Sequence, residues 1–182
     1  MAIISLTGFM GCGKSCVGRI LAQRLGCSFH DLDSIIEKSS GRSIPEIFAS
    51  DGEGAFRMME LAALREFVQG QGGGDGLAGI SSVLSLGGGT LTTPECVSIV
   101  RNHTVCIYLK ASEDTLVRNL SCTQIEGRPM LDGAKDEAAL RERIRSLMEK
   151  RSGIYEAAGT HIVAVDNLSP EAVAEAVFNI LL

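Results

Sequence analysis

The sequence predicts an α/β fold built on a mainly parallel sheet. Apolar strand-like segments alternate with segments of helical periodicity along the 182 residues, and this alternation is typical of parallel strands joined by crossover helices. The length suits one domain with a sizeable core and leaves little room for two. With 45% hydrophobic and 21% charged residues, the composition is that of a globular protein.

Five segments are expected to form the strands of this sheet. Most of them are short apolar runs bounded by glycine or polar residues, as buried strands are. The expected strands cover residues 2–7, 28–31, 80–86, 105–109 and 160–165.

Capping signals between these strands mark the starts and ends of helices. Lys14–Leu25 places its apolar residues at helical spacing and is expected to end at Gly26. The threonine–proline pair at 93–94 and the serine–proline pair at 169–170 each fit an N-cap followed by proline at the first helical position. Ser112 is expected to cap a further helix.

Composition and charge exclude several classes of function. A net charge of −5 disfavours nucleic acid or an anionic membrane as the main partner. No apolar run approaches the roughly 18 residues that a membrane helix needs, and the first residues lack the basic leader of a signal peptide. The six cysteines form no CxxC pair, so we expect free thiols and a cytoplasmic location.

Two stretches interrupt the pattern of strands and helices. Residues 70–79 hold six glycines and are expected to form a flexible surface loop. Residues 121–133 combine polar residues with two glycines and a proline. The sequence is compatible with two interpretations of this second stretch, a mobile lid and a long loop.

The segment GFMGCGKS at 8–15 fits the phosphate-loop pattern GxxxxGK[ST]. It follows an expected strand and opens an expected helix, so its backbone N–H groups and the helix N-terminus favour phosphate binding. Lys14 is expected to reach the β- and γ-phosphates and Ser15 to ligate Mg²⁺. The alternative is a glycine-rich turn that binds nothing, and GTPases, ATPases and kinases share the motif. The loop residues expected to contact the nucleotide are Gly11, Cys12, Gly13, Lys14, Ser15 and Cys16.

Two aspartates, Asp31 and Asp33, lie at the end of the second expected strand. Strand alternation predicts that both point to the same side, beside the phosphate loop at the carboxyl edge of the sheet. One carboxylate would then hold Mg²⁺ through water, and the other would accept a proton from a substrate hydroxyl. The alternative is that one of them caps the helix that contains residues 35–37.

Glu53, Arg57 and Glu60 are spaced to form one acid–base–acid stripe in the helix expected after Asp51. The interpretation without a functional role is a solvated row of ion pairs, which contributes little to stability. The alternative is that the two glutamates hold the Arg57 guanidinium rigid, so that it grips a substrate carboxylate.

Three glycines and two later arginines complete the candidate site. Gly87, Gly88 and Gly89 end the third expected strand, and a run of three suggests close approach of the backbone to a ligand. Arg128 lies in the possible lid, where it would close over phosphates. Arg151 lies late in the long helix expected from about residue 135, where interaction with the helix C-terminus is the alternative.

Taken in order, these segments resemble the shikimate kinase family over nearly the whole chain. The phosphate loop is generic, but the acid pair, the arginine stripe, the triple glycine and the two later arginines are much more specific together. The matching segments are GFMGCGKS at 8–15, FHDLDSIIE at 29–37, GRSIPEIFASDGEGAFRMME at 41–60, LSLGGGT at 84–90, GRPML at 127–131 and KRSGIY at 150–155.

The resemblance implies a three-layer α/β/α P-loop kinase fold with a five-stranded parallel sheet. Residues 1–182 would form a single domain. Within it, a helical substrate-binding section would cover about 33–60 and a lid about 119–133. A monomer is expected, with neither nucleic acid nor membrane as a partner.

The resemblance also implies roles for individual residues. Asp33, Arg57 and Arg151 would bind shikimate with the glycines at 87–89, Asp33 holding ring hydroxyls and the arginines the carboxylate. Asp31 would serve the hydration shell of Mg²⁺. Arg128 would reach the phosphates from the lid, and Arg118 is the candidate for stacking on adenine. The residues implied in catalysis itself are Lys14, Asp33 and Arg128.

The implied reaction transfers the γ-phosphoryl group of ATP to the 3-hydroxyl of shikimate, a step of chorismate and aromatic amino acid biosynthesis. ATP is the co-substrate and Mg²⁺ the cofactor. The alternative function is that of gluconate kinase or another small-molecule P-loop kinase.

Overall fold

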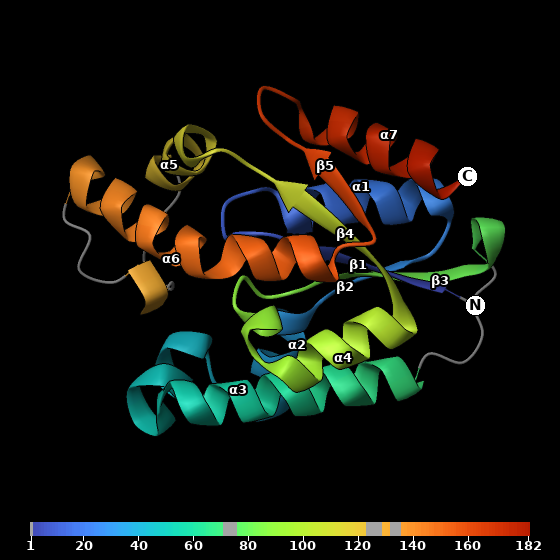
Figure 1. The fold of residues 1–182 in the computed structure, drawn as a ribbon. Coiled ribbons are helices and arrows are strands. Elements are labelled where there is room, and N and C mark those ends of the chain that lie inside the picture. The colour runs from blue at the N-terminus through green and yellow to red at the C-terminus, as the bar shows by residue number, and fades with distance from the viewer. Residues whose placement is uncertain (1, 71–75, 123–128, 132–135) are drawn as a thin grey trace.

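A five-stranded, entirely parallel sheet organises the chain, in the order β2-β3-β1-β4-β5 (Figure 1). The computed structural model describes residues 2–70, 76–122, 129–131 and 136–182. The strands are β1 (Ala2–Thr7), β2 (Ser28–Asp31), β3 (Ile80–Ser85), β4 (Thr104–Lys110) and β5 (His161–Ala164).

Helices cover both faces of the sheet. On one face lie α1 (Lys14–Leu25) and α7 (Pro170–Leu181), and on the other lie α4 (Pro94–His103) and α6 (Glu137–Ala158). Below α4 in Figure 1 lies α3 (Ile44–Gly70), which packs against α2 (Leu32–Ser40), while α5 (Glu113–Ser121) packs on α6. The three-layer α/β/α arrangement expected from the sequence is confirmed.

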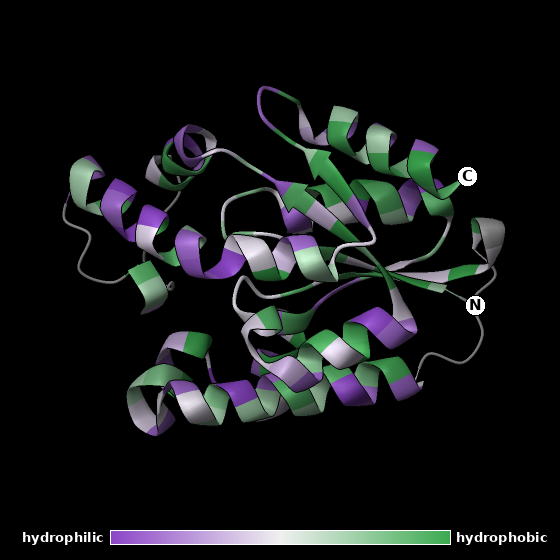
Figure 2. Ribbon diagram, viewed as in Figure 1, coloured by the Kyte–Doolittle hydropathy of each residue, from purple (hydrophilic) through white to green (hydrophobic). Residues whose placement is uncertain are grey.

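The core lies between the central strands and these two helical layers. All residues of β3 and five of the six in β1 are buried, as expected where helices cover both faces of a parallel sheet. Figure 2 shows hydrophobic residues along β1, β4 and β5 in the middle of the molecule, whereas α6 carries many hydrophilic residues. Gly18 allows α1 to approach the sheet, because a Cβ atom there would lie 2.5 Å from the Phe29 ring.

Local signals in the sequence predicted most element boundaries. Helix Lys14–Leu25 is confirmed, and it ends where Gly26 takes a left-handed conformation with φ of 67°. Ser112 and Ser169 cap α5 and α7 by accepting hydrogen bonds from backbone N–H groups. The residue before Pro94, Thr93, precedes α4 as predicted, but its side chain makes no capping hydrogen bond.

The segment that precedes the arginine stripe differs from the prediction. The helix was expected to begin after Asp51, but α3 already begins at Ile44 and is kinked at Gly52, where φ is 81°. Glycine tolerates this left-handed conformation without a steric penalty. Arg42 pairs with Asp51 at 2.6 Å, which ties the start of α3 to the residue just before the kink.

The two interrupting stretches lie partly outside the described residues. Residues 71–75 of the glycine-rich segment, and 123–128 and 132–133 of the expected lid, fall in the gaps. The parts that are described include two short 3-10 turns, Leu77–Gly79 and Pro129–Leu131. All six cysteines are free thiols, as predicted. None of the described helices combines the length and the apolar character needed to cross a membrane.

Candidate active site

A cavity of about 430 Å³ opens at the carboxyl ends of β1, β2 and β3. In the sheet, β2 and β3 lie on one side of β1, and β4 and β5 lie on the other. Open parallel sheets bind ligands at the point where the strand order reverses in this way. The predicted residues that line the cavity are Gly11, Gly13, Lys14, Ser15, Cys16, Asp31, Asp33, Arg57, Gly87, Gly88, Gly89 and Arg151.

The loop between β1 and α1 has the backbone shape that a phosphate loop requires. Gly8, Gly11 and Gly13 have φ angles of 143°, 85° and 95°, a region that other residues rarely adopt. Gly11 is also sterically required, since a Cβ atom there would lie 2.9 Å from the Leu120 side chain. The loop therefore delivers the N-terminus of α1, with its partial positive charge, to the cavity.

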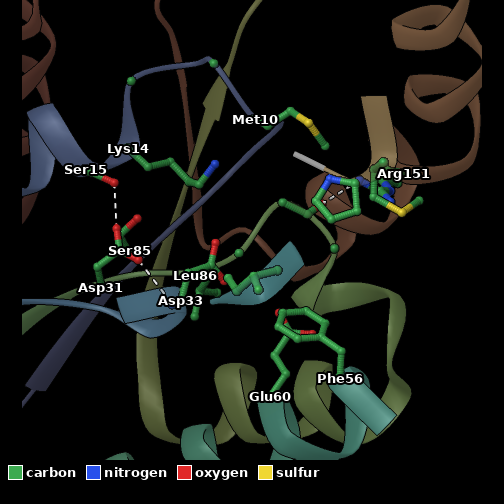
Figure 3. A pocket seen from close by; sticks show the side chains of 18 of the residues that line it. Met10, Lys14, Ser15, Asp31, Asp33, Phe56, Glu60, Ser85, Leu86 and Arg151 are labelled. Carbon is green, nitrogen blue, oxygen red and sulfur yellow. Dashed lines mark hydrogen bonds between the residues drawn. The ribbon is translucent and has the colours of Figure 1, made fainter. Parts of the chain in front are cut away.

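Lys14 bends back over this loop and stays almost buried, with 9% of its surface exposed. Its Nζ donates to the carbonyl oxygens of Gly8 at 2.8 Å and Phe9 at 3.1 Å. Figure 3 shows the amine facing the cavity from the opposite side to Arg151. The ammonium group is thus placed beside the N-terminus of α1, where an anionic ligand would meet both.

Ser15 and Asp31, the two predicted metal ligands, contact each other. The Ser15 hydroxyl donates to Asp31 Oδ2 at 2.7 Å (Figure 3). The second oxygen of Asp31 accepts from the backbone N–H of Asp33, so the predicted helix-capping role is also confirmed. Hydroxyl and carboxylate oxygens suit Mg²⁺. Within the described ranges, no group of three or more acidic, histidine or cysteine side chains could hold a metal ion. A Mg²⁺ ion beside Ser15 and Asp31 would therefore need further oxygen atoms from water or from a bound phosphate.

Asp33 is in the cavity wall, but not for the predicted reason. It lies in the first turn of α2 and not on a strand, so strand alternation does not place it. A Cβ atom on Gly87 would lie 2.9 Å from Asp33 Oδ1, which shows how closely the glycine turn passes this carboxylate. Burial, together with the negative charges of Asp31 and Glu60, raises the pKa of Asp33 to about 6, while Lys14 opposes the rise.

The arginine stripe is not a solvated row of ion pairs. Arg57 pairs with Glu60 at 2.8 Å and with Glu53 at 3.0 Å, and the Glu60 side chain is fully buried. Glu60 also accepts a hydrogen bond from the Thr90 hydroxyl. Arg57 Nε is buried and has no hydrogen-bond partner among the described residues. The two ion pairs therefore hold the Arg57 guanidinium in one orientation.

Arg151 is buried in the cavity wall, with 4% of its surface exposed. Its Nη1 donates to the carbonyl oxygen of Gly88 at 3.2 Å. Of the acidic side chains in the described part of the chain, none forms an ion pair with it. Because α6 continues to Ala158, the predicted alternative of a helix C-terminal interaction does not apply. A buried positive charge without an acidic partner favours an anionic ligand.

Three predicted residues are not placed in the cavity wall. Cys12 is part of the phosphate loop, but its side chain is buried, with the sulfur 4.0 Å from Lys14 Nζ. Arg118 is exposed and donates to the Thr115 hydroxyl on its own helix, and its expected stacking role stays a prediction. Arg128 lies outside the described residues.

Several residues of the site were missed by the sequence analysis. Asn119 donates to the carbonyl oxygen of Gly11 at 2.9 Å and so braces the phosphate loop from α5. Tyr155 donates from its hydroxyl to the carbonyl oxygen of Gly88. Only its position four residues after Arg151 hinted at this role. Apolar residues of the cavity wall were also missed, among them Met10, Ile44, Phe48, Phe56 and Met130.

Comparison with known proteins gives a consistent result over the chain. The family model described as shikimate kinase matches residues 10–182. A shikimate kinase of Thermus thermophilus is 44% identical over 172 residues, which is 94% of this chain and 85% of that protein. The shikimate kinase of Chlorobaculum tepidum is 41% identical over 158 residues, covering 85% and 77% of the two chains.

Solved structures agree with these sequence relatives. The shikimate kinase of Acinetobacter baumannii in complex with shikimate superimposes with a TM-score of 0.85 and 26% identity. The match covers all of this chain and 93% of that one. The three-layer fold and its phosphate loop are therefore those of this group of kinases.

Proposed function

The chain belongs to the shikimate kinase family, and we propose that its cavity transfers the γ-phosphoryl group of ATP to the 3-hydroxyl of shikimate. The products are shikimate 3-phosphate and ADP. The proposal rests mainly on the environment of Arg151. Its guanidinium is buried, lines the cavity and has no acidic partner among the described residues. Such a group is stable when a ligand carboxylate supplies the missing negative charge.

Arg57 forms the other half of the acceptor-binding wall. Its ion pairs with Glu53 and Glu60 fix the plane of the guanidinium, and its buried Nε has no hydrogen-bond partner among the described residues. A planar fork held in this way suits a carboxylate better than a flexible ammonium does. We assign the carboxylate of shikimate to Arg57 and Arg151, and the glycines at 87–89 to the adjacent wall.

The phosphate loop holds the donor. Its backbone N–H groups and the N-terminus of α1 bind the phosphates of ATP, and Lys14 supplies a positive charge where negative charge accumulates during transfer. Ser15 and Asp31 present hard oxygen donors 2.7 Å apart, which suit the Mg²⁺ that accompanies ATP. When bound, Mg²⁺ neutralises phosphate charge.

Asp33 is the candidate base. With a pKa of about 6, its carboxylate is mostly ionised at neutral pH and is a stronger proton acceptor than an ordinary aspartate. As the acceptor oxygen bonds to the γ-phosphorus and the bond to the bridging oxygen of ADP breaks, the hydroxyl proton passes to Asp33. The apolar side chains Met10, Phe48 and Phe56 line the same cavity and help to exclude water.

Two expected features stay predictions. Arg128 would approach the phosphates from the lid, and it lies outside the described residues. The monomeric state is equally an expectation from the family resemblance.

ADP release from MgATP by the purified protein tests the proposal directly. Shikimate, gluconate, nucleoside monophosphates and no acceptor are compared side by side. We expect stimulation by shikimate alone, and a drop of about 10³-fold in the Lys14→Ala variant, because that change removes a preorganised positive charge at the transferred group. Stimulation by gluconate and not by shikimate would keep the phosphate loop and reject the acceptor assignment.

A further inference from the structure

The carbonyl oxygen of Gly88 receives two hydrogen bonds from α6. Arg151 donates through Nη1 at 3.2 Å, and Tyr155 donates through its hydroxyl. The two donors are four residues apart and therefore share one face of the helix. Both are buried, with 4% and 1% of their surfaces exposed. Together they fill both lone pairs of a single carbonyl in the cavity wall.

The turn that carries this carbonyl passes close to both the phosphate loop and Arg57. A Cβ atom on Gly88 would lie 3.2 Å from the backbone nitrogen of Met10 in the phosphate loop. On Gly89, a Cβ atom would collide with Arg57 Nη2. The turn is therefore wedged between the donor loop and the Arg57 guanidinium, so its position helps to set the distance between the two arginines.

Tyr155 is suited to hold this turn. Its ring packs against Tyr108 of β4, with 5.3 Å between ring centroids, so the side chain is anchored on the sheet. Burial raises the pKa of the Tyr155 hydroxyl, which keeps it protonated and able to donate at neutral pH. The positive charge of Arg151, which donates to the same carbonyl, opposes that rise.

We propose that Tyr155 is a positioning residue of the acceptor site. By holding the Gly88 carbonyl, it fixes the direction in which Arg151 presents its remaining N–H groups to the acceptor carboxylate. Without the hydroxyl, Arg151 becomes the only described donor to this carbonyl and is drawn toward it. This role deepens the proposed function and rests on it.

Tyr155→Phe removes one oxygen atom and keeps the ring. We expect the KM for shikimate to rise roughly tenfold, the factor that corresponds to about 1.4 kcal/mol for one lost hydrogen bond near a charged group. The KM for ATP and kcat should change by less than about twofold, because the lost hydrogen bond ends on Gly88 and the contacts of Lys14 with Gly8 and Phe9 remain.

Tyr108→Phe is the matched control. Tyr108 is equally buried at 1% exposure and lies against the same ring, but among the described residues its hydroxyl makes no hydrogen bond to the glycine turn. A purely structural loss would shift both variants alike, so equal kinetic effects of the two variants would overturn the positioning role. Melting temperatures of both variants show whether folding is affected. If Tyr155→Phe melts too early for turnover assays, shikimate and ATP affinities are measured by calorimetry in the cold.

A double-mutant cycle with Arg151→Ala tests whether Tyr155 acts through Arg151. In the Arg151→Ala background, Tyr155→Phe should change the affinity for shikimate by less than about twofold, because the group it positions is gone. Additive losses would overturn the proposal.

The wild-type measurement separates this inference from the proposed function. A wild-type protein that does not phosphorylate shikimate overturns both. An active wild type in which Tyr155→Phe matches Tyr108→Phe overturns only the role of Tyr155.

Discussion

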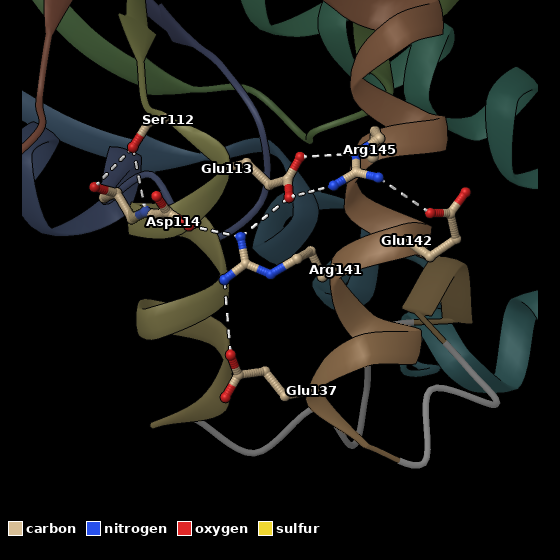
Figure 4. A network of polar contacts seen from close by, with 8 residues as sticks. Ser112, Glu113, Asp114, Glu137, Arg141, Glu142 and Arg145 are labelled. Carbon is tan, nitrogen blue, oxygen red and sulfur yellow. Dashed lines mark hydrogen bonds and ion pairs between the residues drawn. The ribbon is translucent and has the colours of Figure 1, made fainter.

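Two sets of arginines in this molecule have opposite environments. Arg57 and Arg151 line the cavity, Arg57 half-buried and Arg151 buried, and Arg151 has no acidic partner among the described residues. Arg141 and Arg145 lie on the outside of α6 and pair with several acids, including Glu113 of α5 (Figure 4). The outer arginines pair with acids at the surface, whereas in the cavity Arg57 pairs with the fully buried Glu60 and Arg151 pairs with no acid that the structure describes.

This contrast shows which charges serve a ligand. Exposed ion pairs contribute little because water already solvates their charges and salt screens them. A buried guanidinium loses that solvation, so it is stable only where something else compensates the charge. The number of ion pairs an arginine makes is therefore a poor guide to its functional weight here.

Replacing a cavity arginine should have the largest effect. In Arg57→Ala, kcat/KM for shikimate should fall by about 10²–10³-fold, the range expected when one partner of a buried charged contact is truncated. The affinity for ATP should hold, because Arg57 faces the acceptor side of the cavity. Steady-state kinetics with each substrate varied in turn measures both.

Arg65→Ala is the control for this variant, since Arg65 is an exposed arginine on the same helix. Arg57→Lys keeps the charge and loses the planar fork, so it should recover only part of the loss. If Arg57→Ala has normal kinetics and only a lowered melting temperature, Arg57 stabilises the fold and does not bind the substrate. The functional difference between cavity and surface arginines would then be wrong for Arg57.

The two arginine sets also show how far the sequence predicts the site. Local signals were sufficient for the phosphate loop, because Gly13 and Gly26 set the conformation at both ends of α1. The motif order likewise predicted that Arg57 and Arg151 belong to one site, and both line the cavity. Burial was not predictable in the same way: the stripe of Glu53, Arg57 and Glu60 has the spacing of a solvent-exposed row. Only packing against the glycine turn reveals that Glu60 is fully buried.

Contacts between distant segments account for what the sequence analysis missed. Tyr155 and Gly88 are 67 residues apart, and Asn119 and Gly11 are 108 apart. No local periodicity encodes such pairs. The sequence correctly predicted that Asp33 lies beside the phosphate loop, but it assigned Asp33 to the strand. Asp31 is the last residue of β2 and the N-cap of α2, so Asp33 belongs to the helix.

The carboxylates of the two regions should differ in their response to pH. Burial raises the pKa of Asp33 to about 6, whereas hydrogen bonds from Arg145 and Arg141 lower the pKa of Glu113. If Asp33 is the base, kcat/KM for shikimate should fall about tenfold per pH unit below pH 6. A pH–rate profile from pH 8 to about 5 measures this, and a flat profile would remove Asp33 from the proton transfer.

Protein stability should not follow activity in this window. A carboxyl group whose folded pKa is above its unfolded value stabilises the fold most when protonated, below the unfolded pKa, and this contribution is lost as pH rises through about 6. Acidification from pH 7 to 5 therefore does not destabilise the fold through Asp33, and Glu113 stays ionised there because its pKa is lowered. Melting temperatures recorded beside the kinetics separate loss of the base from unfolding.

Removing a surface arginine should have the smallest effect. Arg141 contacts Glu113 at 3.1 Å, Asp114 at 2.6 Å and Glu137 at 3.7 Å, and so joins α5 to α6 on the outside of the molecule (Figure 4). In Arg141→Ala, turnover of shikimate should stay within about twofold of wild type, because exposed pairs of this kind contribute little. A small fall in melting temperature at low ionic strength should shrink in high salt as the pairs of the wild type are screened. A loss of turnover comparable to that of Arg57→Ala would mean that the α5–α6 contact controls the cavity, and burial would then not separate functional from structural arginines in this protein.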